Sequence, residues 1–251
     1  MAGPTIKTQE EIAIMREGGK ILANCLKELK KLAVAGISTL QLDQFAENFI
    51  RKAGAEPSFK GYHGFPATLC TSIDEQVVHG IPSKTQILKN GDIIKIDCGV
   101  FYKGFHTDAT ILVGIGEISQ EKKKLISVAE ETLGQAIDMI KDGVYLGDLS
   151  GTIEKNIVKN GYSVVRDLTG HGVGRKLHEP PVVTNYRDQK YPILKAGMTL
   201  AIEPIFATGS GKIKTLQDNW TIVTADNSLA AQIEHTVLVT EDGCEILTQA
   251  K

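Results

Sequence analysis

Two aspartates, Asp97 and Asp108, lie in a stretch that could hold two negative charges close together. Residues 92–113 contain two apolar runs with a short turn-forming segment between them, which predicts a β-hairpin. We expect the turn to centre between Tyr102 and Lys103, which places the aspartates directly opposite each other with Cβ atoms about 5 Å apart. Like charges repel at this spacing on a half-buried sheet, so we expect a divalent metal ion between them.

Two glutamates and a histidine further along the chain extend this set of candidate metal ligands. Glu203 and Glu234 each lie in an apolar run, and His171 lies between glycines that allow close approach of the backbone. Four carboxylates and one imidazole suit Mn²⁺, Fe²⁺ or Co²⁺ better than a structural zinc ion. Four negative charges balance two divalent cations, and a two-metal site polarises a carbonyl and lowers the pKa of bound water to about 7.

Taken one at a time, these side chains also have ordinary structural explanations. A single buried acid is more often a strand-edge or salt-bridged residue than a metal ligand, but five such residues in two matching hairpin contexts favour a site. His79 and His178 could equally belong to a turn and to a rigid loop. We interpret three further histidines as structural or as supports for the ligands: His63, His106 and His235.

The elements that would position these residues repeat in order along the chain. Thr8 with Glu11 and Ser38 with Gln41 form capping boxes. Caps and apolar periodicity predict helices at residues 9–32, 39–52, 119–141 and 148–159. Later apolar runs predict strands and hairpins at residues 163–167, 198–206, 220–224 and 229–247. Two helices followed by strands, twice over, predict an α+β fold with helices on one side of a curved antiparallel sheet.

Composition excludes several classes of protein. A formal net charge of −2 over 251 residues gives no general attraction to nucleic acid or to an anionic membrane. The four cysteines form no C-x-x-C pair, which argues against a zinc ribbon and favours reduced thiols. Neither a signal-peptide pattern nor a run of about 18 apolar residues occurs, so we expect a cytoplasmic protein without a membrane span. Nothing in the sequence indicates an obligate oligomer, and we expect a monomer.

An ordered series of motifs resembles the type I methionine aminopeptidases. The motifs are residues 61–82, Lys-Ile-Asp-Cys-Gly-Val at 95–100, His-Thr-Asp-Ala-Thr at 106–110, residues 170–174, Leu-His-Glu-Pro-Pro at 177–181, and residues 201–204 and 233–236. They extend over nearly the whole chain, from about Ile6 to Leu247. The resemblance implies the pita-bread α/β fold, with one catalytic domain over residues 1–251 and pseudo-symmetric halves at approximately 8–115 and 116–248.

The same resemblance implies an activity and a metal site. The activity is removal of the initiator methionine from nascent polypeptides whose second residue is small. Asp97 would hold one divalent ion, His171 and Glu203 the other, and Asp108 and Glu234 would bridge the two. The resemblance leaves the identity of the ions open among Co²⁺, Mn²⁺, Fe²⁺, Ni²⁺ and Zn²⁺.

Catalytic roles and a substrate pocket also follow from the resemblance. Glu203 would act as the general base, His178 would bond the scissile carbonyl, and His79 would contact the peptide nitrogen. A linear thioether fits an apolar, aromatic slot through dispersion and sulfur–aromatic contacts. Besides the two histidines, the expected pocket residues are Phe59, Tyr62, Phe65, Cys70, Leu177 and Trp220.

Two other functions stay open at this point. Xaa-Pro aminopeptidases and prolidases share the fold and the ligands, but they usually carry an N-terminal domain for which no room exists before Gly61. A non-catalytic peptide-binding module of the same fold tends to have lost metal ligands, whereas all five are present here. The expected partners are the N-termini of nascent polypeptides, and docking on the ribosome is a further partnership that the sequence leaves open.

Overall fold

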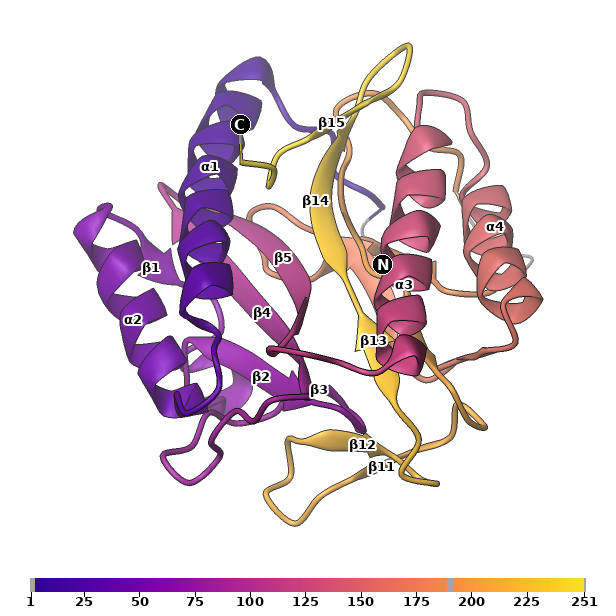
Figure 1. Ribbon diagram of the computed structural model, residues 1–251. Helices are drawn as coiled ribbons and strands as arrows, with labels where there is room; N and C mark the ends of the chain where they lie inside the picture. Colours follow the sequence, from indigo (N-terminus) through magenta and orange to yellow (C-terminus); the bar gives the residue numbers. More distant parts are fainter. Residues whose placement is uncertain (1–2, 189–191, 251) are drawn as a thin grey trace.

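Within residues 3–188 and 192–250, which this computed structural model describes, four α-helices lie against a nine-stranded antiparallel sheet (Figure 1). They are α1 (Gln9–Leu32), α2 (Thr39–Lys52), α3 (Gln120–Asp138) and α4 (Leu146–Lys159), and a short 3₁₀ helix spans Tyr62–Gly64. In Figure 1, α1 and α2 lie in front of one side of the sheet, and α3 and α4 lie in front of the other. No helix in the described residues has the length and apolar character needed to cross a membrane.

The strands form one large sheet and two small ones. The large sheet runs in the order β1 (Glu56–Pro57), β4 (Ile93–Tyr102), β5 (Phe105–Gly114), β14 (Glu234–Val239), β9 (Thr199–Ile202), β7 (Thr169–Gly172) and β8 (Glu179–Thr184), with β2 (Leu69–Ile73) also paired to β4 and β15 (Cys244–Ile246) to β14. The small sheets contain β13 (Ala230–Gln232), β10 (Ile205–Ala207) and β6 (Ser163–Val164), and β11 (Ile213–Thr215), β12 (Ile222–Thr224) and β3 (Gln76–Val78). Because β5 and β14 are neighbours, segments far apart in the sequence meet at the centre of the large sheet.

Side-chain caps determine where the first two helices begin. Thr8 accepts a hydrogen bond from the backbone N–H of Glu11, and the Glu11 carboxylate accepts one from the N–H of Thr8. Ser38 and Gln41 make the same reciprocal pair at the start of α2. The observed bounds of α1 and α2 confirm those predicted from these caps.

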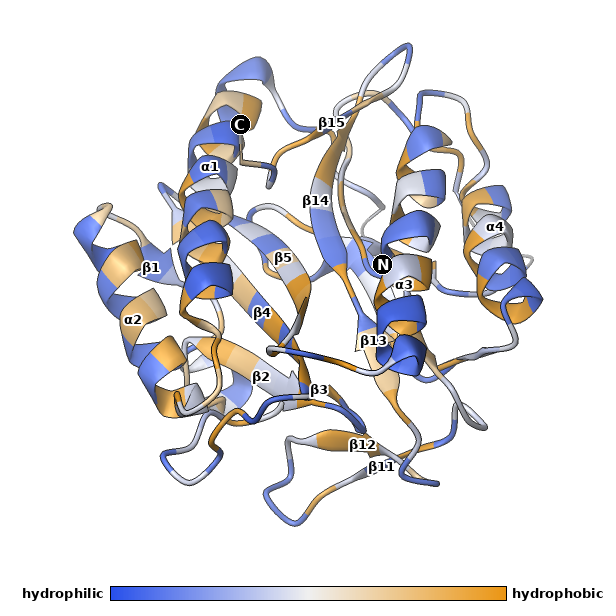
Figure 2. Cartoon of the chain, viewed as in Figure 1, coloured by the Kyte–Doolittle hydropathy of each residue, from blue (hydrophilic) through white to orange (hydrophobic). Residues whose placement is uncertain are grey.

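Each helix pair packs on its own apolar core. Apolar and polar residues alternate around the helices in Figure 2, as expected for helices with one buried side. Leu22 of α1 and Leu42 of α2 join Ile94 of β4 in one fully buried cluster. Ile153 of α4 and Leu200 of β9 belong to another. The predicted α+β fold, with helices covering an antiparallel sheet, is confirmed, whereas its division into two related halves of one domain stays a prediction.

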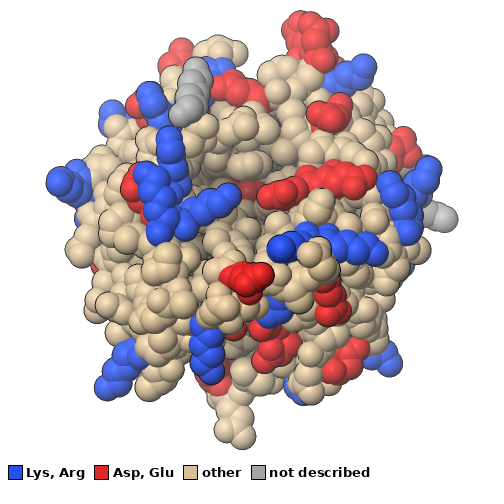
Figure 3. Space-filling model, in the orientation of Figure 1, with Lys and Arg blue, Asp and Glu red and all other residues tan. Residues whose placement is uncertain are grey.

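Charged side chains of both signs are interspersed on the helix-bearing face. Figure 3 shows Lys and Arg side by side with Asp and Glu over this face, without a broad region of either sign. This arrangement agrees with the net charge of −2. It gives this face no general attraction to a polyanion.

The β4–β5 hairpin has a different register from the one that we predicted. Lys103 and Gly104 form its two-residue turn, and both have positive φ angles, 47° and 90°, as a type I′ turn requires. Asp97 consequently lies opposite Thr110, two positions from Asp108. The prediction that the two aspartates lie directly opposite each other is wrong. They are diagonal neighbours on the same face of the sheet, still within reach of a shared cation.

Several other predicted elements differ in their bounds. The predicted strand at 198–206 is two strands, β9 and β10, interrupted at Glu203 and Pro204, because proline cannot donate a ladder hydrogen bond. α3 ends at Asp138 rather than Lys141, α4 begins at Leu146 rather than Asp148, β6 ends at Val164 rather than Asp167, and β12 begins at Ile222 rather than Trp220. The predicted run at 229–247 contains β13, β14 and β15, and strands β1, β7, β8 and β11 were not predicted.

Substitution of Gly19 in α1 should destabilise the protein. A Cβ atom at Gly19 would lie 2.2 Å from the backbone oxygen of Leu247, so helix and C-terminal segment would have to move apart. We expect Gly19→Ala to lower the free energy of unfolding by about 1–3 kcal/mol, measured by thermal and urea denaturation. Gly134 of α3 is the matched control, because nothing lies within 4 Å of its Cβ position and alanine there should stabilise the helix by about 0.5–1 kcal/mol. If Gly19→Ala stabilised the protein as much as Gly134→Ala, the predicted clash with the Leu247 oxygen would be wrong.

Candidate active site and metal centre

Neighbouring strands bring acidic side chains into one row across the sheet. Asp97 on β4 lies opposite Thr110 on β5, which in turn lies opposite Glu234 on β14. The Thr110 hydroxyl donates to Glu234 Oε2 at 3.0 Å and so orients that carboxylate. Asp108 is fixed through its backbone, whose N–H donates to the Thr236 hydroxyl at 2.9 Å and whose carbonyl accepts from it at 2.8 Å. Strands β4, β5 and β14 therefore position three carboxylates on one face of the sheet.

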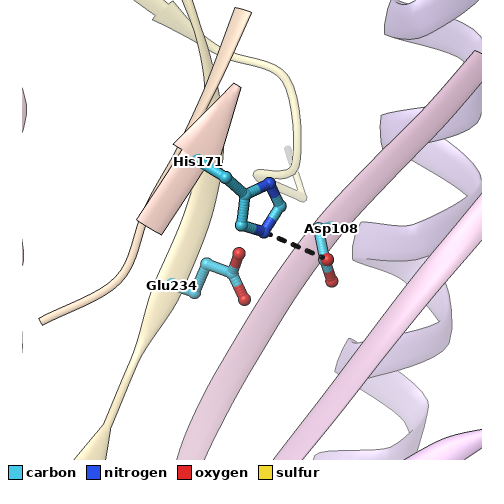
Figure 4. Close-up of side chains that lie close together, drawn as sticks. All are labelled: Asp108, His171 and Glu234. Atoms are coloured by element: carbon cyan, nitrogen blue, oxygen red, sulfur yellow. Dashed lines mark ion pairs between the residues drawn. The ribbon is translucent and has the colours of Figure 1, made fainter. Parts of the chain in front are cut away.

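His171 on β7 and Glu203 at the end of β9 complete the cluster. His171 Nε2 lies 3.6 Å from Glu203 Oε1 and 4.0 Å from Asp108 Oδ2. One possible ligand atom from each of Asp108, His171 and Glu234 lies within 4.8 Å of the other two. Figure 4 shows these three side chains pointing toward one another from β5, β7 and β14. Asp97 and Glu203 line the same cavity, so all five predicted ligands come together.

Close packing of the backbone sets the position of His171. A Cβ atom at Gly170 would lie 2.4 Å from the Ala201 oxygen, and one at Gly172 would lie 2.3 Å from the Pro180 oxygen. Only glycine on both sides lets this strand approach its neighbours so closely. His171 Nδ1 donates to the backbone oxygen of Gly172 at 2.9 Å. This bond fixes the tautomer and leaves the Nε2 lone pair for a metal ion.

Burial raises the pKa of every carboxyl group in the cluster. The pKa of Asp97 is raised to about 7, and those of Asp108, Glu203 and Glu234 lie well above their usual values because neighbouring carboxylates add to the effect of burial. Burial also lowers the pKa of His171 to about 3, so its imidazole is neutral. The cluster can therefore carry four negative charges at neutral pH only when cations compensate for them.

The same residues fit a divalent metal ion. One buried oxygen in each of Asp97, Asp108 and Glu234 has no hydrogen-bond partner among the described residues. Such atoms are costly unless a ligand satisfies them. Carboxylate oxygens with one neutral imidazole form a donor set that suits Mn²⁺, Fe²⁺ or Co²⁺.

The cluster lines a cavity of about 490 Å³ that also has an apolar wall. Phe59, Phe65, Cys70 and Leu177 form a buried cluster against which Tyr62 and Trp220 pack. The Phe65 and Trp220 rings meet edge to face with centroids 5.1 Å apart. Every residue that the sequence analysis assigned to the site lines this cavity: Phe59, Tyr62, Phe65, Cys70, His79, Asp97, Asp108, His171, Leu177, His178, Glu203, Trp220 and Glu234.

Two further imidazoles line the cavity beside the carboxylates. The His178 ring lies 4.2 Å from the His171 ring, centroid to centroid, and its Nδ1 lies 2.9 Å from the Tyr62 hydroxyl. His79 has a positive φ of 59°, and its ring meets that of Trp220 edge to face. Burial lowers the pKa of both His178 and His79. Both are therefore neutral imidazoles at pH 7, with one nitrogen that donates and one that accepts.

Sequence reasoning missed Gln232. Its amide Nε2 donates to Glu203 Oε2 at 3.2 Å, and its amide also lowers the pKa of Asp97. Its Oε1 is buried and has no partner within the described part of the chain. A polar residue two positions before Glu234 in an otherwise apolar segment was the available signal.

The three histidines interpreted as structural have different surroundings. His106 Nδ1 lies 2.9 Å from the Ser58 hydroxyl, and His235 Nδ1 lies 2.9 Å from the Thr248 hydroxyl. Neither residue lines the cavity, whereas His63 does. His106 and His235, which lie close to Asp108 and Glu234 in the sequence, thus contact hydroxyl groups and do not line the cavity.

Fold and donor set together define a metal-dependent hydrolase. The chain belongs to metallopeptidase family M24, whose family profile matches residues 13–241. Members of this family use divalent metal ions, in agreement with the donor set described above. The identity of the metal stays open.

Within family M24 the chain belongs with the methionine aminopeptidases. A methionine aminopeptidase of Clostridium perfringens is 50% identical to it over 98% of this chain and 99% of its own length. Methionine aminopeptidase 1 of Bacillus subtilis is 48% identical over 97% of this chain and 98% of its own. The crystal structure of methionine aminopeptidase from Thermotoga maritima superposes with a TM-score of 0.96 at 42% identity, covering 98% of this chain and 99% of that one. The predicted pita-bread fold is confirmed.

A more distant likeness is limited to the fold. The prolidase from Pyrococcus furiosus matches 98% of this chain but only 66% of its own, with a TM-score of 0.80 and 24% identity. This match shows that the same fold occurs in a prolidase. It does not favour prolidase activity in the present chain.

Without metal, the protein should lose stability as pH rises. A carboxyl group whose pKa is raised on folding binds more protons in the folded state than in the unfolded state between the two pKa values. For Asp97 this window runs from about 4, the unfolded value, to about 7. Buried histidines with a lowered pKa, such as His171, act in the opposite direction up to about pH 6.5, so we expect the thermal midpoint of the metal-free protein to fall from about pH 6.5 to about pH 7.5. Added Mn²⁺ should oppose the fall, because it binds the deprotonated carboxylates.

Substitution of a single ligand isolates this effect. Asp97→Asn removes one titrating group, so its midpoint should fall less between the same pH values. Asp242→Asn, at an exposed position on the β14–β15 turn, is the matched control and should retain the wild-type dependence. A metal-free protein whose midpoint is unchanged across this range would contradict the proposed electrostatics.

Proposed function

We propose that this chain removes the N-terminal methionine from polypeptides whose second residue is small. The observation that carries the proposal is the arrangement of the cavity, in which a five-residue donor set adjoins a narrow apolar wall containing Phe59, Phe65 and Trp220. The named relatives at 48% and 50% identity support the same activity. N-termini of nascent polypeptides are the proposed substrates.

The five ligands would hold two divalent ions. Asp97 would hold one, His171 and Glu203 would hold the other, and Asp108 and Glu234 would contribute to both. Four carboxylate charges match two divalent cations, which accounts for the buried oxygens without partners in three of these residues. When bound, such a pair of ions polarises a peptide carbonyl and lowers the pKa of water at the site to about 7.

Glu203 is the proposed general base. Its Oε1 faces His171, and its Oε2 accepts from the Gln232 amide. Because burial and its acidic neighbours raise its pKa, its carboxylate can take up a proton from the attacking water more readily than an exposed glutamate. Gln232 holds the carboxylate in one orientation and keeps it from turning away from the cavity.

His178 and His79 are the proposed contacts of the scissile peptide group. In this proposal the Tyr62 hydroxyl, 2.9 Å away, donates to His178 Nδ1, which leaves the other nitrogen protonated to donate to the substrate carbonyl. A single donor at a developing oxyanion contributes about 3 to 4 kcal/mol. The neutral His79, on the Trp220 side of the cavity, contacts the nitrogen side of the peptide.

The apolar wall is the proposed pocket for the methionine side chain. Phe59, Phe65 and Leu177 are buried in one cluster, and Trp220 lies edge to face with Phe65. A flexible thioether gains dispersion and sulfur–aromatic contacts in such a slot. Cys70, also in this wall, stays protonated because burial raises its pKa well above the usual value.

The proposed setting is the cytoplasm, where the protein acts as a monomer on chains that emerge from the ribosome. All four cysteines are free thiols, and three of them are buried. Reduced thiols are typical of that compartment.

A peptide assay separates the proposed function from its two alternatives. With added Mn²⁺, Co²⁺ or Fe²⁺ under anaerobic conditions, we expect cleavage of Met-Ala-Ser and no cleavage of Ala-Pro-Ala. The reverse preference would identify an Xaa-Pro aminopeptidase. Inactivity toward both peptides with every divalent metal would favour a non-catalytic peptide-binding module.

Replacement of Glu203 by glutamine should nearly abolish turnover. We expect kcat to fall by about 10²–10⁴-fold, because both a metal ligand and the general base are altered. Circular dichroism should show an intact fold, since glutamine has the same shape and the position is buried beside Gln232. The exposed Glu241 provides a matched control, and Glu241→Gln should retain wild-type kcat. Wild-type turnover by Glu203→Gln would remove this residue from the mechanism.

A further inference from the structure

A buried ion pair joins the N-terminal segment to the loop that carries His178. Lys7 Nζ donates to Glu179 Oε2 at 2.9 Å, and only 3% and 5% of the two side chains are exposed. The backbone N–H of Lys7 donates to the Gly197 oxygen at 2.8 Å, which anchors the segment just before β9. Lys7 and Glu179 are 172 positions apart in the sequence. This contact lies outside the metal ligands and outside the cavity lining.

Glu179 connects this segment to the loop through both carboxylate oxygens. Oε1 accepts from the backbone N–H of Lys176 at 2.9 Å, within the loop itself. Oε2 accepts from the Thr5 hydroxyl at 2.6 Å as well as from Lys7. Glu179 directly follows His178 in the chain and pairs with Gly172 at the start of β8. Its carboxylate thus links the loop, the first strand residue after it and the N-terminal segment.

The lysine side chain fills space that only a glycine leaves free. A Cβ atom at Gly174 would lie 2.4 Å from Lys7 Cε and 3.2 Å from Glu179 Oε1. Gly174 also donates its N–H to the Lys176 oxygen and accepts from the N–H of His106. Residues 173–178 are therefore held from both sides, by β5 and by the N-terminal segment.

A role in stability alone is a weak explanation for this arrangement. Removing two charges from water costs about as much free energy as their mutual attraction supplies. A buried ion pair is therefore weak evidence for stabilisation. What such a pair does supply is a fixed geometry, because each additional hydrogen bond restricts the carboxylate further. The group whose position depends on it most directly is the imidazole one residue away.

We propose that Thr5 and Lys7 are positioning residues for His178, acting through Glu179. The proposal rests on the function proposed above, in which His178 donates to the scissile carbonyl. A displacement of a donor by about 1 Å can reduce a rate by about a hundredfold. Loss of the contacts that Thr5 and Lys7 make with Glu179 should therefore lower kcat with a smaller effect on KM, because the oxyanion forms only along the reaction path.

The test compares Lys7→Met in two backgrounds. In the wild-type background, with metal saturating and well below the unfolding temperature, we expect kcat for Met-Ala-Ser to fall by about tenfold or more. In a His178→Ala background the same substitution should change kcat by less than about twofold, because the group that it positions is already absent. A full loss in both backgrounds, or no loss in the first, would overturn the proposal.

Two further variants keep the test independent of folding. Lys7→Met leaves the Glu179 carboxylate buried without its cationic partner, so the double variant Lys7→Met with Glu179→Gln should be more stable than the single variant and should still show the reduced kcat. Thr5→Val removes one donor at an exposed position and should lower kcat in the same direction by a smaller factor. Recovery of wild-type kcat in the double variant would show that the loss came from instability and would overturn the proposal.

A matched control separates this contact from ion pairs in general. Arg16 and Glu245 form an exposed pair at 2.7 Å between α1 and β15, and Arg16→Met should leave kcat unchanged. The wild-type enzyme provides the other comparison. If it does not cleave Met-Ala-Ser, the proposed function fails, whereas an active wild type with unaffected Lys7→Met and Thr5→Val variants overturns only the positioning role.

Discussion

Electrostatic repulsion among buried carboxylates is the constraint on which the rest of this structure depends. Asp97, Asp108, Glu203 and Glu234 lie in one cavity, and burial raises the pKa of each. An apolar environment alone would protonate them, and only compensating cations keep them charged at neutral pH. The strands, the glycines around His171 and the hydroxyl of Thr110 all hold these groups in place against that repulsion. The binding free energy of the cations thus supports an arrangement that the polypeptide would not favour by itself.

The helices and the identity of the site could be predicted because their signals are local. Capping boxes determine where α1 and α2 begin, and carboxylates within apolar runs indicate Asp97, Glu203 and Glu234 as candidate ligands. The hairpin register could not be predicted, because it depends on a lysine that adopts a positive φ at position 103. Strands β7 and β8 were missed since their glycines and prolines weaken strand patterns and their partners lie far away in sequence.

Roles within the site depend on contacts that no single segment reveals. Gln232 on β13 contacts Glu203, which lies just before the neighbouring strand β10, and the Tyr62 hydroxyl contacts His178, 116 positions away in sequence. No sequence pattern predicts either contact, because the two residues of each pair come together only in the folded structure. The family resemblance indicated His178 as a site residue, whereas the structure was needed to show that the Tyr62 hydroxyl contacts it.

The short pairing of β5 with β14, here called the seam, joins the two sides of the large sheet. Only Glu234 with Thr110 and His235 with Ala109 are paired along it within the described residues. Proposed ligands lie on both sides of this short seam, with Asp97 and Asp108 on one and Glu234 on the other. Cations bound there would connect the two sides directly. Metal affinity and resistance to separation at the seam are then one linked equilibrium, so depletion of metal in the surroundings would loosen the molecule at its centre while its outer helices stay packed.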